Sequence, residues 1–170
     1  MKIRPYVEST DYEYLEKWVD DEKVHTMWCA NHIPYPLTKE NLHRFLEKNT
    51  IESSDGAYVA VEDDGRIVGF FCYVINVLDR TGFLKCIIVD RKKRGTGCGK
   101  EMLKLALQYA FDQTGVDTVQ LNVFDENAAA KYCYKKVGFV EESVSYHVFP
   151  YKDELLSRCH MIIEKGQFIL

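Results

Sequence analysis

The sequence predicts a single α+β domain built on a mixed, mostly antiparallel sheet of about seven strands with about four helices. Three observations support this class. Short runs rich in β-branched and aromatic residues recur along the chain, and segments with apolar residues at helical spacing separate several of them. A glycine-rich segment at 91–100 joins a strand-like run directly to a helix-like run. No repeat, linker or low-complexity stretch interrupts the 170 residues, so we expect one domain over 1–170.

The first part of the chain predicts one strand and two helices. Residues Ile3–Val7 are typical of a strand, and Thr10 and Glu13 have the spacing of a capping box that opens a helix. The segment Met27–Pro36 is aromatic and proline-rich, which predicts either a lid or pocket wall, or a cover for the core. Thr38 then caps the second helix.

The middle of the chain predicts a three-strand antiparallel meander. Residues Ala57–Val61 and Ile67–Val77 flank a turn at 63–65, as in a β-hairpin. A second turn at 79–82 leads into a strand that ends at Val89. The meander therefore delivers the chain to the glycine-rich segment.

The last part alternates helices and strands. A helix over Glu101–Phe111 ends near Gly115, and Asn127 caps a shorter helix that Gly138 ends. The predicted strands of this part are Val119–Phe124, Phe139–Val148 and Arg158–Ile163.

The composition excludes several classes of protein. With 46% apolar and 13% aromatic residues, the chain has enough material for its own core. A net charge of -4, with no long basic run beyond 91–94, argues against nucleic-acid binding. No apolar stretch approaches the length of a membrane span, and the N-terminus has no signal-like apolar core. We therefore expect a cytoplasmic protein without a nucleic-acid or membrane partner.

The cysteines lack the short paired spacings of a metal site. Most lie inside apolar runs, so we expect reduced core residues and no disulfide or metal. The six are Cys29, Cys72, Cys86, Cys98, Cys133 and Cys159. Cys98 allows two interpretations, because a helix N-terminus with basic neighbours makes a thiol reactive, whereas an inward position makes it a small hydrophobe.

The segment 91–100, with the sequence RKKRGTGCGK, is the strongest functional signal. It follows Cys86–Val89, which is typical of a buried strand, and precedes a helix, so its glycines lie at a helix N-terminus. Glycines let the backbone approach a ligand, and the free N–H groups of the first helical turn point toward it. The basic residues of the segment add positive charge. The segment therefore predicts a site for a phosphate or pyrophosphate.

Spacing excludes two familiar phosphate loops. A Walker A loop requires glycine five residues before Gly99, where this chain has Arg94, and serine or threonine where it has Glu101. A dinucleotide fingerprint that starts at Gly95 finds no third glycine at the required position. What remains is Arg94, Gly97 and Gly99 as a pattern for another cofactor, or a glycine-rich turn with incidental basic residues.

A second motif lies at 127–139, with the sequence NAAAKYCYKKVGF. Ala130, Tyr134 and Val137 are spaced four and three residues apart, so they share one face of the helix that Asn127 caps. The side chain of Tyr134 is therefore expected to point toward whatever this face of the helix contacts.

The two motifs, in this order and with a strand between them, resemble those of the GNAT superfamily of acetyl-CoA-dependent N-acetyltransferases. The first resembles the acetyl-CoA pyrophosphate loop of the superfamily, and the other its second conserved motif. The resemblance implies a single acetyltransferase domain over 1–170, with acetyl-CoA as cosubstrate. It also implies a sheet that splays open between the strand ending near Val89 and the strand beginning near Val119, with the thioester in the gap.

The resemblance further implies individual roles. The backbone of Ile87 and Val89 would hydrogen-bond the pantetheine arm, which Asn127 would also contact. Tyr134 would protonate the departing thiolate, and the backbone N–H of Val89 would donate to the oxyanion. A phenol with a pKa of about 10 donates to a thiolate with a pKa of about 8.5 at little cost. The implied cofactor-binding residues are Ile87, Ile88, Val89, Arg94, Gly95, Thr96, Gly97, Cys98, Gly99, Lys100, Asn127 and Tyr134.

The sequence does not reveal which group takes the proton of the amine. Family members with a carboxylate base carry it on one of two central strands, and the matching positions are Phe83 and Asn122, neither of which accepts a proton. A primary amine with a pKa of about 10.4 must nevertheless lose a proton. The candidates are Glu62, His147 and His160, each of which is alternatively a solvated carboxylate or a satisfied histidine.

We therefore expect an enzyme that moves an acetyl group from acetyl-CoA to a primary amine of a small molecule or a protein N-terminus by direct attack. An acidic chain suits a cationic amine such as a polyamine or an aminoglycoside. The alternatives are a GNAT-fold acetyl-CoA-binding sensor or interaction module without turnover, and a nucleotide-binding protein. The apolar tail Phe168–Leu170 packs either on its own core or on a partner, which would make the protein a homodimer.

Overall fold

The computed structural model describes residues 1–52 and 56–169, and within them the strands form one seven-stranded sheet in the order β1-β2-β3-β4-β5-β7-β6. The strands are β1 (Lys2–Pro5), β2 (Gly56–Val61), β3 (Ile67–Asn76), β4 (Thr81–Val89), β5 (Thr118–Phe124), β6 (Val140–Tyr151) and β7 (Glu154–Glu164). β4 and β5 are parallel, and every other neighbouring pair is antiparallel. The predicted fold class, including the meander of β2, β3 and β4, is confirmed.

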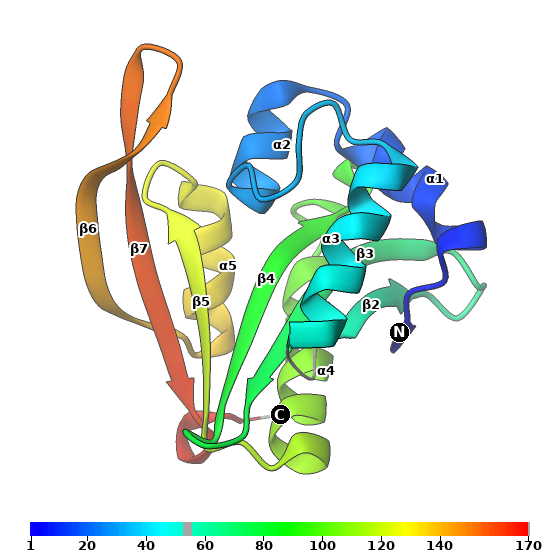
Figure 1. Ribbon diagram of the computed structural model, residues 1–170. Helices are drawn as coiled ribbons and strands as arrows, with labels where there is room; N and C mark the ends of the chain where they lie inside the picture. The colour runs from blue at the N-terminus through cyan, green and yellow to red at the C-terminus, as the bar shows by residue number, and fades with distance from the viewer. Residues whose placement is uncertain (53–55, 170) are drawn as a thin grey trace.

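The helices cover both faces of this sheet (Figure 1). They are α1 (Glu8–Trp18), α2 (Glu22–Cys29), α3 (Lys39–Glu52), α4 (Cys98–Tyr109) and α5 (Ala128–Val137). α1, α2 and α3 lie on one face, and α4 and α5 lie on the other. The sequence predicted about four helices and missed α2. This helix forms because the carboxylate of Asp21 accepts a hydrogen bond from the N–H of Val24 at 2.8 Å and caps it.

The first helix does not use the predicted capping box. α1 begins at Glu8, and the fully buried carboxylate of Asp11 accepts the N–H of Val7 at 2.7 Å and two hydrogen bonds from Arg4 at 2.7 and 2.9 Å. Desolvation opposes ionisation of Asp11, but these hydrogen bonds outweigh it and lower the pKa of the carboxyl. The prediction for Thr10 and Glu13 was therefore wrong, because a charged group from one turn further along satisfies the helix end.

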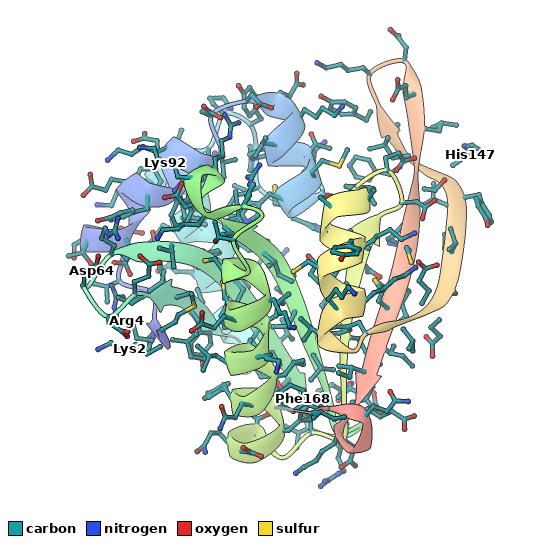
Figure 2. The ribbon with its side chains drawn as sticks, turned by 180° about the vertical axis from the view of Figure 1, so that it is seen from behind. Lys2, Arg4, Asp64, Lys92, His147 and Phe168 are labelled. Carbon is teal, nitrogen blue, oxygen red and sulfur yellow. The ribbon has the colours of Figure 1, made fainter. Side chains whose placement is uncertain are left out.

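The C-terminal tail packs on its own chain. The ring of Phe168 lies 5.6 Å from that of Phe111, against the end of α4 (Figure 2). Ile169 is 81% exposed, and Leu170 lies outside the described residues. Of the two interpretations of the tail, packing on its own core holds for Phe168.

β4 and β5 pair at one end of their seam and separate at the other. Parallel pairs run from Thr81 with Thr118 to Leu84 with Leu121, and beyond this point the two strands diverge (Figure 1). We call the stretch 81–84 with 118–121 the paired half, and the stretch 85–89 with 122–124 the open half. The predicted splayed sheet is therefore present between β4 and β5.

A β-bulge in β4 sets the direction of the side chains in the open half. The register against β3 shifts at this point, and Cys86 has φ 51°. The indole N–H of Trp28 donates to the carbonyl of Cys86 at 2.7 Å and holds the bulge. Beyond it, Ile87 and Val89 pack toward α4 and α5, whereas Ile88 packs toward α1, α2 and α3.

Candidate active site

A cavity of about 740 Å³ lies at the open half, between α2, β4, the start of α4, and α5. All of the predicted cofactor-binding residues except Thr96 and Cys98 line it. The hydroxyl of Thr96 instead donates to the carbonyl of Lys93 at 2.7 Å. The side chain of Cys98 is buried in the core beneath α4, where burial raises the pKa of its thiol to about 11. The inward interpretation of Cys98 therefore fits the structure.

The N-terminus of α4 has the geometry of an anion site. Gly97 precedes the helix with φ 90°, and Gly95 has φ 77°, so both use left-handed backbone that favours glycine. No atom lies within 4 Å of the position that a Cβ would take at either residue, so the space above this backbone is open. The first intrahelical bond of α4 runs from Glu101 N–H to the Gly97 carbonyl, which leaves the preceding N–H groups for a ligand.

The cavity is positively charged although the protein is acidic. Its lining includes the basic residues Lys23, Arg94, Lys100 and Lys136, and among the described lining residues Glu126 is the one carboxylate. Within the part of the chain that the structure describes, none of these four basic side chains pairs with a carboxylate. Unpaired cations that converge on one cavity fit a polyanionic ligand such as the phosphates of CoA.

Two neighbouring basic residues, Arg91 and Lys93, are neutralised by carboxylates outside the cavity. Lys93 lies 2.6 Å from a carboxylate oxygen of Glu62, and Arg91 lies 2.7 Å from Asp20 and 2.9 Å from Asp21. The glycine-rich segment thus places Arg91 and Lys93 in ion pairs and Arg94 and Lys100 in the cavity, while Lys92 is exposed outside it.

The backbone of β4 presents polar groups to the open half. Asp90 N–H donates to the Val68 carbonyl of β3 at 2.9 Å, so by strand alternation the N–H and carbonyl of Val89 face the side that β5 has left. The guanidinium of Arg94 donates to that carbonyl at 3.4 Å. The N–H of Val89 is therefore directed at the gap.

Tyr134 belongs to the lining of the same cavity. Its side chain is 7% exposed and packs edge-on against Phe139, with ring centroids 6.0 Å apart. No described residue hydrogen-bonds the hydroxyl, and the residue lines the cavity. Burial raises the pKa of Tyr134 well above its usual value. The phenol is thus a weaker acid than the solvated phenol assumed from the sequence.

The predicted cap of α5 is confirmed. The side-chain oxygen of Asn127 accepts the N–H of Ala130 at 3.2 Å, and Gly138 ends the helix with φ 116°. Asn127 and Ala130 also line the cavity. α5 therefore places Tyr134 and Asn127 along one wall of the cavity, and Asn127 is both the cap of the helix and the predicted cofactor contact.

The three candidate bases lie in different places. Glu62 is held by Lys93, and His147 lies at the outer edge of the β6–β7 hairpin with its Nδ1 3.4 Å from the Leu155 carbonyl (Figure 2). His160 is different, because its Nδ1 lies 2.9 Å from the amide oxygen of Asn122. Its Nε2 lies 3.4 Å from Glu142 of β6. Asn122 is the first residue of β5 beyond the paired half, so only His160 stands at the fork of the sheet.

Two features of the lining were missed from the sequence. α2 supplies a wall through Lys23, Val24, Met27 and Trp28, of which the segment Met27–Pro36 gave a partial signal. Trp28 is also 6% exposed and part of the core, so both interpretations of that segment apply to it. Tyr132 lies off the face that carries Ala130, Tyr134 and Val137, yet it lines the cavity and is 65% exposed.

An open α+β sheet with an exposed helix N-terminus at its fork has the geometry to hold a phosphorylated, extended ligand between two strands. Residues 12–139 match the model of the acetyltransferase (GNAT) family, and the chain belongs to this family. It is an acetyl-CoA-dependent N-acetyltransferase that transfers acetyl to an amine, as the resemblance implied.

Named relatives agree with this assignment. The chain is 28% identical over 170 residues to spermidine N(1)-acetyltransferase of Escherichia coli K12, covering 99% of this chain and 88% of the relative. It is 29% identical over 153 residues to mycothiol acetyltransferase of Kytococcus sedentarius, covering 88% of this chain and 49% of that one. The fold matches spermidine N-acetyltransferase of Vibrio cholerae in complex with CoA and spermine, with a TM-score of 0.83 at 20% identity, covering 98% and 96% of the two chains.

Two kinds of feature are absent from the described residues. No helix among them is long and apolar enough to cross a bilayer. No group of three or more His, Cys, Asp or Glu side chains among them is placed to hold a metal ion.

Proposed function

We propose that this enzyme acetylates the primary amine of a small cationic molecule by direct attack on acetyl-CoA in the open half of the β4–β5 seam. The observation that carries the proposal is the unpartnered hydroxyl of Tyr134, a largely buried residue that lines the same cavity as Val89 with its free N–H. The N–H of Val89 suits the developing oxyanion, and the hydroxyl of Tyr134 suits the leaving sulfur. A primary amine at a protein N-terminus is the competing acceptor.

In the proposed reaction, the backbone N–H of Val89 donates to the thioester oxygen as it becomes an oxyanion. A preorganised backbone donor loses little on reorganisation, so it acts mainly on the transition state. Tyr134 donates its proton to the sulfur as the carbon–sulfur bond breaks. Burial raises the pKa of Tyr134, but the same burial disfavours a thiolate and so raises the pKa of the CoA thiol. The pKa values of the proton donor and acceptor therefore shift in the same direction.

We propose that His160 takes the proton of the amine, through water. If the Nδ1–H of the neutral ring donates to Asn122, the free lone pair on Nε2 faces Glu142. A proton gained at Nε2 then faces the Glu142 carboxylate, while Nδ1–H keeps its hydrogen bond to Asn122. Replacing His160 by Gln keeps a hydrogen bond to Asn122 and removes the base. We expect kcat to fall while the Kd of acetyl-CoA stays unchanged, and an unaltered kcat would exclude His160.

For the acceptor, we propose a polyamine-like molecule, because relatives of this chain are named for spermidine. A panel of spermidine, spermine, an aminoglycoside and a short peptide with a free N-terminus would be incubated with acetyl-CoA, with release of free thiol as the readout. We expect the highest kcat/KM with a polyamine. A peptide that surpasses every small amine would redirect the assignment to protein N-termini.

We also propose a cytoplasmic location and a homodimer. The location is supported by the six cysteines, all of which are free and five of which are buried. Light scattering of the purified protein would test the dimer, and a monomer mass at micromolar concentration would contradict the proposed homodimer.

A further inference from the structure

We propose that Trp28 is a positioning residue for acetyl transfer. Its indole N–H holds the β-bulge at Cys86, and the bulge turns the backbone N–H of Val89 toward the open half. The inference rests on the proposed function, in which the N–H of Val89 donates to the oxyanion. Neither of the two sequence motifs contains Trp28, and its side chain takes no proton in the proposed reaction.

The bulge decides which backbone groups of β4 face the open half. Between two regular pairs with β3, β4 has the two residues Cys86 and Ile87 where β3 has only Phe71. Without this extra residue, Val89 would move into the place of Asp90, whose N–H donates to β3 at 2.9 Å. The oxyanion donor would then be used in strand pairing and lost to the cavity.

The side chains around the bulge show the same change of phase. Lys85 and Cys86 are consecutive, yet both lie on the face that α1, α2 and α3 cover. The ammonium of Lys85 lies 5.6 Å from the centroid of the Phe45 ring of α3, and Cys86 belongs to the core on that face. In a regular strand Val89 would share the face of Lys85, because four residues separate them. It packs instead against α4 and α5.

The bulge needs support from outside β4 because its own backbone is strained. Cys86 has φ 51°, a left-handed conformation that glycine usually supplies as the first residue of a bulge. The supporting contact is the buried hydrogen bond of 2.7 Å from the indole N–H of Trp28 to the Cys86 carbonyl. If that carbonyl turned away, two buried polar groups would lose their partner. Trp28 therefore stabilises the strained conformation over a regular strand.

The indole is itself held in one orientation. Its ring packs edge-on against Phe70 of β3, with centroids 6.1 Å apart, and against His25 one turn earlier in α2, at 6.2 Å. Trp28 is 6% exposed, so these contacts exclude other rotamers of the ring. The indole N–H is therefore a fixed donor, as the precise placement of a catalytic backbone group requires.

The first test is Trp28→Phe, which keeps an aromatic ring and removes the N–H donor. The kcat per CoA-binding molecule should fall at least about tenfold, because the oxyanion donor is no longer held in place. The Kd of CoA should change by less than about threefold, because the N-terminus of α4 is untouched. Trp18→Phe is the matched control. Trp18 is 5% exposed in the same core, but no described residue accepts its indole N–H, so kcat should stay at the wild-type value.

Two further variants separate positioning from a role in filling the core. The benzothiophene analogue of tryptophan at position 28 keeps the bicyclic ring and replaces only the N–H, and it should lower kcat as Trp28→Phe does. Cys86→Gly places at the bulge the residue that adopts a left-handed φ without strain. The double variant Trp28→Phe/Cys86→Gly should therefore regain most of the lost kcat, although it removes a second buried side chain and should melt at a lower temperature.

The backbone amides give a readout that does not depend on activity. In the benzothiophene variant, the amide resonances of Val89 and Asp90 should shift, and those of Thr81–Leu84 should stay in place. Wild-type kcat in this variant, or a double variant no more active than Trp28→Phe, would overturn the positioning role. If the wild type acetylated no amine at all, the proposed function would fall, and the amide shifts would still decide the role of Trp28.

Discussion

The paired and open halves of the β4–β5 seam use the same two strands for opposite purposes. In the paired half, backbone groups bond to each other, and Leu84 and Leu121 are fully buried in the core. In the open half, the bulge at Cys86 and the divergence of β5 leave backbone and side-chain groups directed at a cavity. The site is therefore created where strand pairing stops, and the paired half keeps the two walls in place.

This difference predicts that substitutions in the two halves separate activity from stability. Changes in the open half should lower catalysis or cofactor affinity and leave folding almost intact. Changes in the paired half should lower the free energy of unfolding and leave the chemistry of the remaining folded protein unaltered.

The largest effect is expected for Tyr134→Phe. Removing the hydroxyl should lower kcat by about 10²- to 10⁴-fold with little change in the Kd of acetyl-CoA, because the proton is needed only when charge develops on the sulfur. The ring and its contact with Phe139 are kept, so the melting temperature should barely move. Because burial holds the pKa of Tyr134 well above its usual value, wild-type kcat should show no loss from ionisation of this group up to about pH 10.

Wild-type turnover in Tyr134→Phe, once chemistry is shown to limit the rate, would assign the proton to another donor. Tyr132→Phe is the neighbouring control. It removes a hydroxyl from the same helix and cavity while keeping an aromatic ring at the rim, and it should turn over normally.

In the paired half, Leu121→Ala should lower the free energy of unfolding by about 2–5 kcal/mol. Leu121 is fully buried at the last pair before the strands diverge. Leu155→Ala makes the same change on β7 at a leucine that is 54% exposed, and it should stay within about 0.5 kcal/mol of the wild type. Urea titration of both variants provides the comparison, and equal losses would show that Leu121 is not part of a supporting core.

A smaller effect is expected for Gly97→Val on CoA binding, where the side chain would fill the open space above the loop and weaken the Kd at least about tenfold. Valine at this left-handed position also strains the backbone by about 1–2 kcal/mol. Gly65→Val carries the same strain, because Gly65 has φ 87° with open space around it in the β2–β3 turn. Unaltered CoA affinity in Gly97→Val would show that the pyrophosphate does not bind at this loop.

The smallest effect concerns the thiols. Burial, together with the charge of Glu62, raises the pKa of Cys98 to about 11, so its thiolate is scarce at neutral pH and alkylation should be slow. Cys133 is the one cysteine that is not fully buried, and it lines the cavity. Peptide mass analysis after brief alkylation should therefore find Cys133 modified first and protected by CoA. Preferential labelling of Cys98 would restore its reactive interpretation.

The parts that were predictable from sequence are those that lie within one element or one junction. The glycines before α4, the Asn127 cap and the position of Tyr134 on the cavity face of α5 all follow from spacings of a few residues. Helical and strand periodicity also gave the order of the strands along the chain. Thr38 was correctly identified as a cap, since its hydroxyl accepts the N–H of Asn41 at 3.2 Å.

The parts that were not predictable depend on contacts between distant segments. His160 meets Asn122 only through the register of β5 against β7, 38 residues apart. The bulge at Cys86 depends on its pairing with β3 and on Trp28 from 58 residues away. The predicted cap at Thr10 was wrong because the carboxylate of Asp11, which is paired with Arg4 on β1, accepts the N–H of Val7 at the start of α1. None of these pairings leaves a periodic pattern in the sequence.

The central claim, that acetyl-CoA binds the open half of the seam, is tested most directly by nuclear magnetic resonance of the backbone amides. Addition of saturating CoA should shift the amide resonance of Val89, whose N–H faces the gap, and leave those of Thr81–Leu84 in place. In Gly97→Val the same addition should leave Val89 unshifted. A CoA titration that moves the paired half and leaves Val89 in the wild type unchanged would contradict the account.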